Sequence, residues 1–151
     1  MLALVSQTIP FMLRVVIDTN ILISALRSQF GASYAIFKML GMFYFEFCIS
    51  VSLAMEYEAI AKRMHRLLGL TLREIDDIID YMCLEGRTQK IYYLWRPTLP
   101  DPSDDMLLEL AVASHSTIIV THNTKHFKGA EAFGVRAMKP NDFLRLLEKN
   151  K

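Results

Sequence analysis

The chain has 151 residues, 52% of them hydrophobic and 11% aromatic, which excludes intrinsic disorder as the main state and suits one domain with a full core. Its 17 Lys and Arg nearly balance its 16 Asp and Glu, so the formal net charge is +1 and any basic, nucleic-acid-binding surface must be local. Cys48 and Cys83 lie in apolar contexts without disulfide or metal-ligand spacing, which predicts core thiols in a reducing compartment, the cytoplasm.

Residues 1–13 form an apolar segment that polar residues and a proline interrupt. No basic residue precedes the apolar part and the run is too short to span a bilayer, so neither a signal peptide nor a membrane anchor is expected. Because Met12 stands directly before the first predicted strand, we interpret 1–13 as an extension and 14–148 as the domain. One hypothesis is that Met12 is the natural start, and an intact mass that includes residues 1–11 would reject it.

The stretch over residues 14–26 carries the strongest signal in the chain. Residues 15–17 form a continuous β-branched run, which is typical of a strand buried on both faces of a parallel sheet. Asp18 follows directly, at the carboxyl end of that strand, where open α/β sheets bind their ligands. A carboxylate there needs a cation or hydrogen bonds to compensate its burial. The simpler alternative is that Asp18 only caps the helix that follows.

Apolar periodicity predicts alternating helices and strands along the rest of the chain. A helix follows Asp18 and is broken at residues 28–31. Further helices are expected over 32–40, 52–68, 72–84, 106–114 and 140–147, and strands over 43–50, 90–95, 117–121 and 135–138. A proline-rich loop covers residues 96–102. This alternation favours a doubly wound α/β domain with a parallel sheet.

Two acidic residues lie on the helix predicted over 52–68, and only one of them can face the sheet. The core stripe of this helix follows helical spacing through Leu53, Tyr57, Ile60, Met64 and Leu67. Glu56 falls about 60° from this stripe on a helical wheel, whereas Glu58 points to the solvent side. Glu56 is therefore the acid that can reach a cleft beside the sheet.

A second group of acids surrounds the start of the helix predicted over 106–114. Asp104 shares a face with the apolar residues of that helix, while Asp105 and Glu109 turn outward. Asp101 lies just upstream in the loop. Compensation of the helix dipole explains acids in a first turn, but it does not require one that points inward. The solvent face of the helix over 72–84 is assigned to Asp76, Asp77 and Asp80.

Asp18, Glu56 and Asp104 thus come from different elements but belong to the same edge of the predicted sheet. Like charges this close raise one another's pKa unless a cation keeps them ionised. Carboxylate oxygens suit Mg²⁺ or Mn²⁺, and such an ion can lower the pKa of a water and clamp phosphate oxygens. Phosphodiester hydrolysis is therefore a natural reaction, although acids at a sheet edge also fit a phosphoryl acceptor.

Four motifs, taken in order, resemble the PIN domain. They are Asp18-Thr19-Asn20-x-Leu22 after a strand, the isolated Glu56, the segment Asp101-Pro102-Ser103-Asp104-Asp105 before Leu-Glu-Leu-Ala, and a strand ending in Val120-Thr121. Each motif is weak alone, but their order and spacing together are specific. The resemblance covers almost all of residues 14–147 and is closest to the bacterial and archaeal branch similar to VapC toxins of toxin–antitoxin pairs.

Membership of this family would imply a three-layer α/β/α fold whose central parallel sheet has the order 3-2-1-4-5. It would also imply a Mg²⁺ or Mn²⁺ site and endoribonuclease activity on single-stranded or structured RNA. The partners it implies are a second copy in a homodimer and a small cognate antitoxin, one segment of which plugs the acidic cleft.

The resemblance assigns a role to each residue of the site. Asp18, Glu56 and Asp104 are the catalytic acids that would hold the ion, with Asp101 as a helper. The family often has a further acid after the fourth strand, where this chain has Asn123, so a second ion is expected to bind less tightly. Residues expected to orient Asp18 or a metal-bound water are Asn20, Ser24, Thr121 and Asn123.

In the expected mechanism the ion activates a water for in-line attack on a phosphodiester and stabilises the pentavalent charge. Candidates for contacts to RNA phosphates are Arg63, Arg66, Lys125, His126 and Lys128. His122 and His126 also invite a general-acid or metal-binding role, although loop histidines more often have neither. Tyr92, Tyr93 and Trp95 could stack on bases, yet strand packing explains them more simply.

Two other classes of function are considered besides the nuclease: a silent RNA-binding domain and a phosphoryl-transfer domain. A catalytically weak or silent RNA-binding or scaffolding domain of the same fold is supported by Asn123. A receiver-type phosphoacceptor normally has an acidic pair at the end of the first strand, where this chain has only Asp18, and a haloacid-type phosphatase needs a carboxylate where it has Asn20. Mn²⁺-dependent RNA cleavage that Asp18→Asn abolishes would separate the nuclease from the silent domain.

Overall fold

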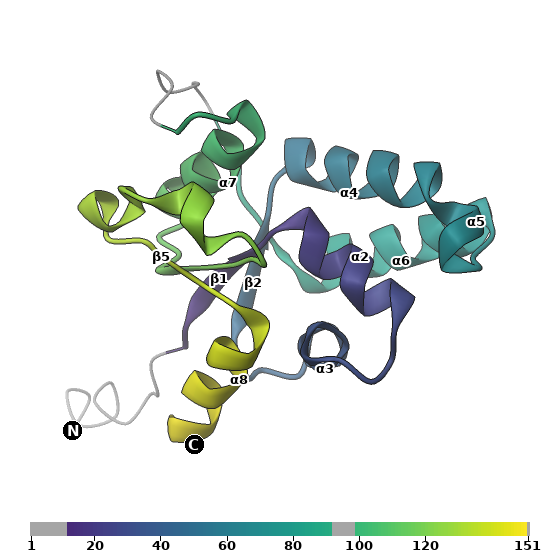
Figure 1. Ribbon diagram of the computed structural model, residues 1–151, viewed down its shortest axis with the longest axis horizontal. Coiled ribbons are helices and arrows are strands. Elements are labelled where there is room, and N and C mark those ends of the chain that lie inside the picture. The colour runs from purple at the N-terminus through teal and green to yellow at the C-terminus, as the bar shows by residue number, and fades with distance from the viewer. Residues whose placement is uncertain (1–11, 92–98, 151) are drawn as a thin grey trace, which may run out of the picture.

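Figure 1 shows a computed structural model of the chain, which describes residues 12–91 and 99–150. Within these residues the strands form a parallel sheet with the order β3-β2-β1-β4-β5. The strands are β1 (Arg14–Ile17), β2 (Glu46–Ile49), β3 (Arg87–Thr88), β4 (Ile118–Val120) and β5 (Arg136–Met138). The predicted parallel sheet and its order are confirmed.

Helices cover both faces of this sheet, so the fold is the predicted three-layer α/β/α arrangement. The described helices are α2 (Thr19–Arg27), α3 (Ala32–Lys38), α4 (Val51–Arg63), α5 (His65–Leu68), α6 (Leu72–Glu85), α7 (Pro102–Ala113) and α8 (Pro140–Lys149), with 3₁₀ turns η1 (Thr124–Phe127) and η2 (Ala130–Phe133). In Figure 1, α2, α3, α4 and α6 lie on one side of the sheet and α7 on the other. Right-handed crossovers explain this division, because the chain moves toward one edge from β1 to β3 and then back past β1 to β4.

The two central strands are buried on both faces, as their β-branched composition predicts. Val16 and Val120 are completely buried. Ile17 pairs with Val120, and the amide of Asp18 donates to the carbonyl of Val120 at 2.9 Å. Pairing therefore continues one residue beyond β1 and holds Asp18 at the carboxyl edge of the sheet, opposite the end of β4.

The helix predicted over 52–68 is interrupted at Met64. This residue takes a non-helical conformation (φ −99°, ψ 9°) that ends α4 and precedes the short α5. The buried face of α4 runs through Leu53, Tyr57 and Ala61. Leu67, predicted to be in the core stripe, is 70% exposed. The helical geometry is broken at Met64, so a single spacing no longer relates the residues on its two sides.

The third strand lies earlier in the chain than predicted. Instead of residues 90–95, β3 pairs with the end of β2, and Gln89 donates its amide to Ile49 at 2.8 Å. The chain leaves β2 after Ile49 and turns into α4, so the described pairing between β2 and β3 ends at this point. Residues 92–98, which include the aromatic residues predicted for this strand, lie outside the described residues.

Gly86 joins α6 to β3, and the substitution Gly86→Ala tests this placement. A Cβ on Gly86 would lie 2.9 Å from the ring of Phe47 and 2.8 Å from the carbonyl oxygen of Met82. We expect a loss of about 1–3 kcal/mol in unfolding free energy, as for other overpacked sites, measured by urea unfolding. Gly31→Ser is the control, since a Cβ at Gly31 has nothing within 4 Å. Equal losses in the two variants would contradict the placement of β3.

Three further burial predictions on helices are wrong. Cys48 is buried as expected, but Cys83 is exposed on α6, and both thiols are free. Glu109 is only 7% exposed, and Asp105 is half-buried and accepts a hydrogen bond from the amide of Leu99 at 2.9 Å. Helix α7 packs against β1, β2, β4 and α4, so most of its circumference is covered and one apolar stripe does not sort its acids.

The other predictions concern the solvent face of α6, a membrane-spanning helix and the limits of the domain. The acids predicted to form the solvent face of α6 are exposed: Asp76, Asp77 and Asp80. In the part of the chain that the structure describes, no helix is long and apolar enough to cross a membrane. Residues 1–11 of the predicted extension lie outside that part, so the domain limits of 14–148 stay a prediction.

Candidate active site

Asp18 lies at the junction of β1 and α2, in an extended conformation (φ −64°, ψ 146°). Its carboxylate makes no hydrogen bond of capping geometry to α2. Instead, its Oδ2 accepts a hydrogen bond from the Thr121 hydroxyl at 2.7 Å, across the end of the sheet from β4. The alternative of a simple helix cap therefore does not describe Asp18, whose side chain turns toward the neighbouring strand.

The environment of Asp18 raises the pKa of its carboxyl group. Burial is the largest cause, and the charge of Glu56 adds to it, while the hydrogen bond from Thr121 acts in the opposite direction. The backbone amides of Thr19 and Asn20 also lie close enough to lower the pKa. A partly buried carboxylate beside a second carboxylate is a site where a cation would be stabilising.

Two hydrogen bonds keep Glu56 beside the start of α2, one made by Glu56 itself and one by the neighbouring residue Tyr57. The Thr19 hydroxyl donates a short hydrogen bond to Glu56 Oε2. The next residue along α4, Tyr57, is completely buried and donates its hydroxyl to the carbonyl of Ile17 at the end of β1. The other acid of this helix, Glu58, faces outward and pairs with Lys62 at 2.7 Å. The structure thus places Glu56, and not Glu58, toward the sheet edge, as the helical wheel predicts.

Asp104 lies in the first turn of α7 and is 8% exposed. Its pKa is raised by burial first, then by the charge of Asp101, and more weakly by Asp18. His126 opposes this rise, with its Nδ1 3.5 Å from Asp104 Oδ2. Asp101 itself caps α7, because its Oδ1 accepts a hydrogen bond from the Ser103 amide at 2.8 Å.

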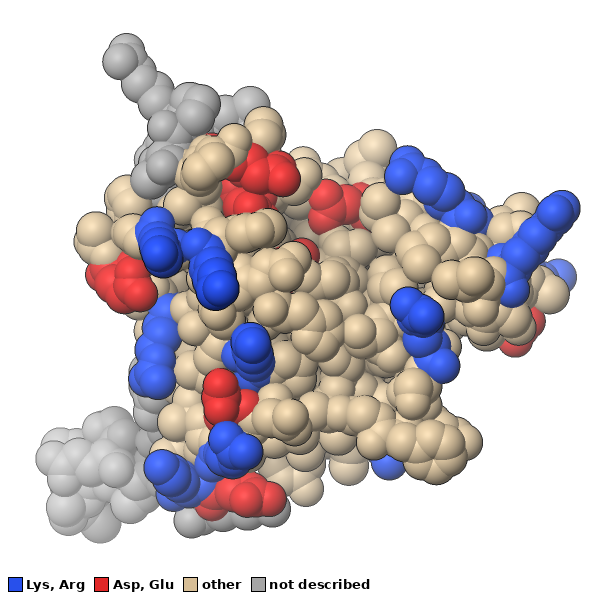
Figure 2. Space-filling view, viewed as in Figure 1, with Lys and Arg blue, Asp and Glu red and all other residues tan. Residues whose placement is uncertain are grey.

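Asp18 is the common member of this acidic group, since it interacts electrostatically with both Glu56 and Asp104. Figure 2 shows acidic side chains gathered near the starts of α4 and α7, one of them at the bottom of a hollow. Among the described residues, no three Asp, Glu, His or Cys side chains already stand close enough to hold a metal ion. The acids therefore face one region without forming a complete set of ligands.

The end of β4 divides the remaining predicted residues into two groups. Thr121 contacts Asp18 directly, and its hydroxyl also accepts a hydrogen bond from the Asn123 amide at 3.0 Å. Asn20 and Ser24 are turned instead toward His122: the Asn20 side chain accepts from the His122 amide at 3.4 Å, and the Ser24 hydroxyl meets the His122 ring at 2.8 Å. The structure thus gives Asn20 and Ser24 a contact that the sequence did not suggest.

The predicted RNA-contacting residues lie on two sides of the acidic group and are all exposed: Arg63, Arg66, Lys125, His126 and Lys128. Basic side chains are visible on both sides of the hollow in Figure 2. Arg63 is about 10 Å further along α4 than Glu56, at the rise of a helix. Two other basic residues, Arg27 and Lys139, line a pocket with His122, and no sequence motif connects them.

The substitution Thr121→Val tests the contact between β4 and Asp18. Valine keeps the shape of this fully buried side chain but removes the hydroxyl that donates to Asp18. Because such supporting hydrogen bonds orient a metal ligand, we expect Mn²⁺ affinity to fall about 10-fold. Calorimetric titration with Mn²⁺ measures the change, and Thr121→Ser, which keeps the hydroxyl, should bind like the wild type. A valine variant of unchanged affinity would remove Thr121 from the site.

These features define an α/β/α domain with an acidic site at the carboxyl edge of its parallel sheet. The family model of the PIN domain matches residues 14–125, which is most of the chain, and the chain belongs to this family. Members of this family are generally nucleases. The predicted family resemblance is thereby confirmed.

Among solved structures, the chain is similar to VapBC2 from Rickettsia felis, determined bound to a DNA fragment from their promoter. The TM-score is 0.59 at 13% sequence identity, with 84% of this chain and 98% of that chain covered. At this identity the likeness establishes the fold. A search of curated proteins finds no match.

Proposed function

We propose that this protein is a metal-dependent endoribonuclease that hydrolyses phosphodiester bonds of single-stranded or structured RNA and acts as the toxin of a toxin–antitoxin pair. The observation that carries the proposal is the position of Asp18, which interacts with Glu56 and Asp104 and is held by Thr121. Partly buried carboxylates that raise one another's pKa are stabilised by a cation, and a cation at such an edge can act on phosphate esters.

The donor set fits a hard divalent ion, since it consists of carboxylate oxygens that Mg²⁺ and Mn²⁺ prefer. Asp18, Glu56 and Asp104 would hold the ion, with Asp101 close to Asp104. Holding it with all three requires side-chain rotation from the positions that the structure shows. When bound, the ion would supply an activated water and would neutralise charge on the phosphate.

The chain's own residues prepare this site in separate ways. Thr121 donates to Oδ2 of Asp18 and so helps to orient its carboxylate. Tyr57 ties α4 to the end of β1 and so limits the movement of Glu56. The exposed Lys and Arg residues near Asp104 provide positive charge for RNA phosphates, and the His126 ring lies beside Asp104.

Partners and location follow from the same proposal. The similarity to VapBC2 supports a cognate antitoxin, a segment of which would cover the acidic cleft. A homodimer is supported by large apolar side chains that are exposed near the ends of α3 and α6, namely Met42, Phe43 and Leu84. Two free thiols suit the cytoplasm. A small upstream gene that overlaps this one would support the toxin role.

Cleavage of labelled single-stranded RNA tests the proposal directly. We expect cleavage with Mg²⁺ or Mn²⁺, none after chelation with EDTA, and recovery when the ion is restored. Asp18→Asn protein purified in parallel excludes a contaminating nuclease. Equal cleavage by the two preparations would refute the assignment of the site.

A silent RNA-binding domain is the second candidate function. It is favoured by Asn123, which contributes no charge where the family often has an acid, and by the incomplete ligand set. Binding of RNA by wild-type protein in Mn²⁺ without any cleavage would establish this alternative. Cleavage that depends on Asp18 would exclude it.

A further inference from the structure

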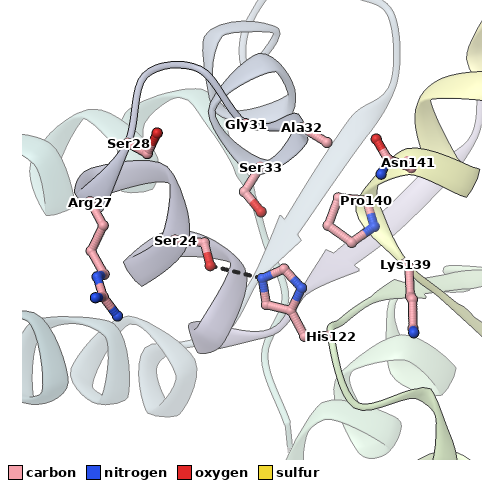
Figure 3. Close-up of a pocket in the computed structure, with 10 residues that line it drawn as sticks. All are labelled: Ser24, Arg27, Ser28, Gly31, Ala32, Ser33, His122, Lys139, Pro140 and Asn141. Carbon is pink, nitrogen blue, oxygen red and sulfur yellow. Dashed lines mark hydrogen bonds between the residues drawn. The ribbon is translucent and has the colours of Figure 1, made fainter.

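A pocket of about 420 Å³ lies beside the acidic group, on the other side of the end of β4. It is formed by α2, the start of α3, the residue after Thr121 and the start of α8. Figure 3 shows Arg27 on one side and Lys139 on the other, with the Ser24–His122 pair between them. Its volume falls in the range of pockets that hold small molecules or single nucleotides.

The pocket carries positive charge and hydrogen-bond donors. Arg27 and Lys139 line it, and none of the described residues that line it is acidic. Neither of these two cations forms an ion pair within the described part of the chain. Cations at two edges of a pocket suit a ligand that carries more than one anionic group, such as a nucleic-acid strand. Arg can also bind a phosphate through two parallel N–H donors.

Ser33 adds a hydroxyl group to the lining of the pocket. Its side chain points into the pocket in Figure 3, and the residue is only 5% exposed. Its hydroxyl has no hydrogen-bond partner among the described residues. Among the described residues no side-chain polar atom is both buried and unpartnered, so this hydroxyl is accessible from the pocket and can donate to a ligand oxygen there.

The pocket is physically continuous with the acidic group. Thr121 contacts Asp18, and the next residue, His122, contributes its ring to the pocket and its amide to a hydrogen bond with Asn20. Along α2, Ser24 is about 9 Å from Asp18, at the rise of a helix. A strand that crosses Asp18 could therefore place a neighbouring nucleotide in the pocket.

We propose that this pocket is a nucleotide subsite, in which Arg27 and Lys139, at opposite edges of the pocket, bind phosphates of the RNA strand that neighbour the one at Asp18. The inference rests on the proposed nuclease function, because it takes RNA as the ligand. The subsite positions the strand and sets its polarity across the acidic group. Its lining does not include His126, which lies beside Asp104, so the two regions would contact different phosphates of the strand.

Salt-dependent RNA binding tests the subsite. Fluorescence anisotropy with a labelled single-stranded RNA is measured in EDTA on the Asp18→Asn protein, so that cleavage does not interfere. Each phosphate contact to a single strand contributes about 0.7 to the slope of log K against log salt concentration. We expect Arg27→Gln and Lys139→Gln each to reduce the slope by about 0.7 and to weaken binding about 3–10-fold at low salt.

Matched variants make the result specific. Arg27→Lys keeps the charge and should keep most of the slope. Arg73→Gln removes the same charge from an exposed position at the start of α6 and should leave the slope unchanged. Equal effects of Arg27→Gln and Arg73→Gln would overturn the subsite, because they would mean that only overall charge matters. Thermal unfolding confirms that each variant is folded.

Two further outcomes separate the subsite from the nuclease proposal. If the pocket variants change the slope but wild-type protein never cleaves RNA, the subsite stands and the hydrolytic function fails. If cleavage depends on Asp18 but the slopes are unchanged, the nuclease stands and the subsite fails. If inorganic phosphate raises the unfolding temperature only when Arg27 is present and the RNA slopes are unchanged, the pocket takes free phosphate and the RNA subsite is overturned.

Discussion

Asp18→Asn is expected to abolish RNA cleavage while making the metal-free protein more stable. The carboxylate is held in contact with Thr121 and interacts with two further acids, so its loss removes the central ligand of the proposed ion. Such an ion supplies several kcal/mol of transition-state stabilisation, so the rate should fall on the order of 10³-fold. Initial rates on labelled RNA at fixed Mn²⁺ measure this loss.

The metal-free Asp18→Asn protein is expected to be more stable than the wild type, because an ionised Asp18 side chain lowers the unfolding free energy in this partly buried position. Burial and the charge of Glu56 raise the pKa of Asp18 in the folded protein, so ionisation there destabilises the folded state. We expect the asparagine variant to unfold about 2–4 °C higher in EDTA, which corresponds to about 1 kcal/mol in a chain of this size. Mn²⁺ should raise the unfolding temperature of the wild type and not that of the variant.

The pH dependence of this gain provides a separate check. Below the unfolded-state pKa of about 3.8 the side chain is protonated in both states, and the two proteins should be equally stable. As pH rises through the window between that value and the raised folded-state pKa, wild-type stability falls relative to the variant, and above the window the difference is constant. Asp77→Asn, at an exposed position on α6, should show neither the rate loss nor the gain. A variant that loses activity and stability together would indicate misfolding instead.

Tyr57→Phe is expected to destabilise the fold and to reduce cleavage although Tyr57 is not one of the acids. Its hydroxyl donates to the carbonyl of Ile17 in a completely buried position. Removing the donor leaves that carbonyl unsatisfied, at a cost of about 1–3 kcal/mol. The same hydrogen bond ties α4 to the end of β1, so Glu56 gains freedom and the rate should fall about 10-fold.

The control for this substitution is Tyr44→Phe, because Tyr44 is 45% exposed and lies away from the acids in the loop before β2. Urea unfolding measures the stability of both variants, and cleavage is measured at a temperature where both are fully folded. A Tyr57→Phe protein that is destabilised but cleaves at the wild-type rate would show that Glu56 is positioned without this hydrogen bond.

The elements that the sequence predicted well are those whose signal is local. The β-branched residues before Asp18 have to be buried on both faces, and this puts them in the centre of a parallel sheet. Helical spacing likewise distinguishes Glu56 from Glu58. The positions of Asp18, at the end of β1, and of Asp104, in the first turn of α7, also follow from elements whose burial is visible in their own residues.

The predictions that failed depend on what one element meets on another. The third strand was expected over residues 90–95, but the segment that pairs with the end of β2 is β3, Arg87–Thr88. Glu109 was expected outside, but α7 is covered by three strands and by α4. Cys83 was expected in the core, but it is exposed on α6.

The sequence by itself determined the alternation of strands and helices, the family, and the place of Asp18 at the end of the first strand. Only the tertiary structure decided which side chains share a space, such as Arg27, Ser33 and Lys139 around one pocket. The physical reason is that periodicity encodes which face of an element is buried, a property of neighbouring residues. It does not encode which distant element covers that face, because that follows from how all the elements pack together.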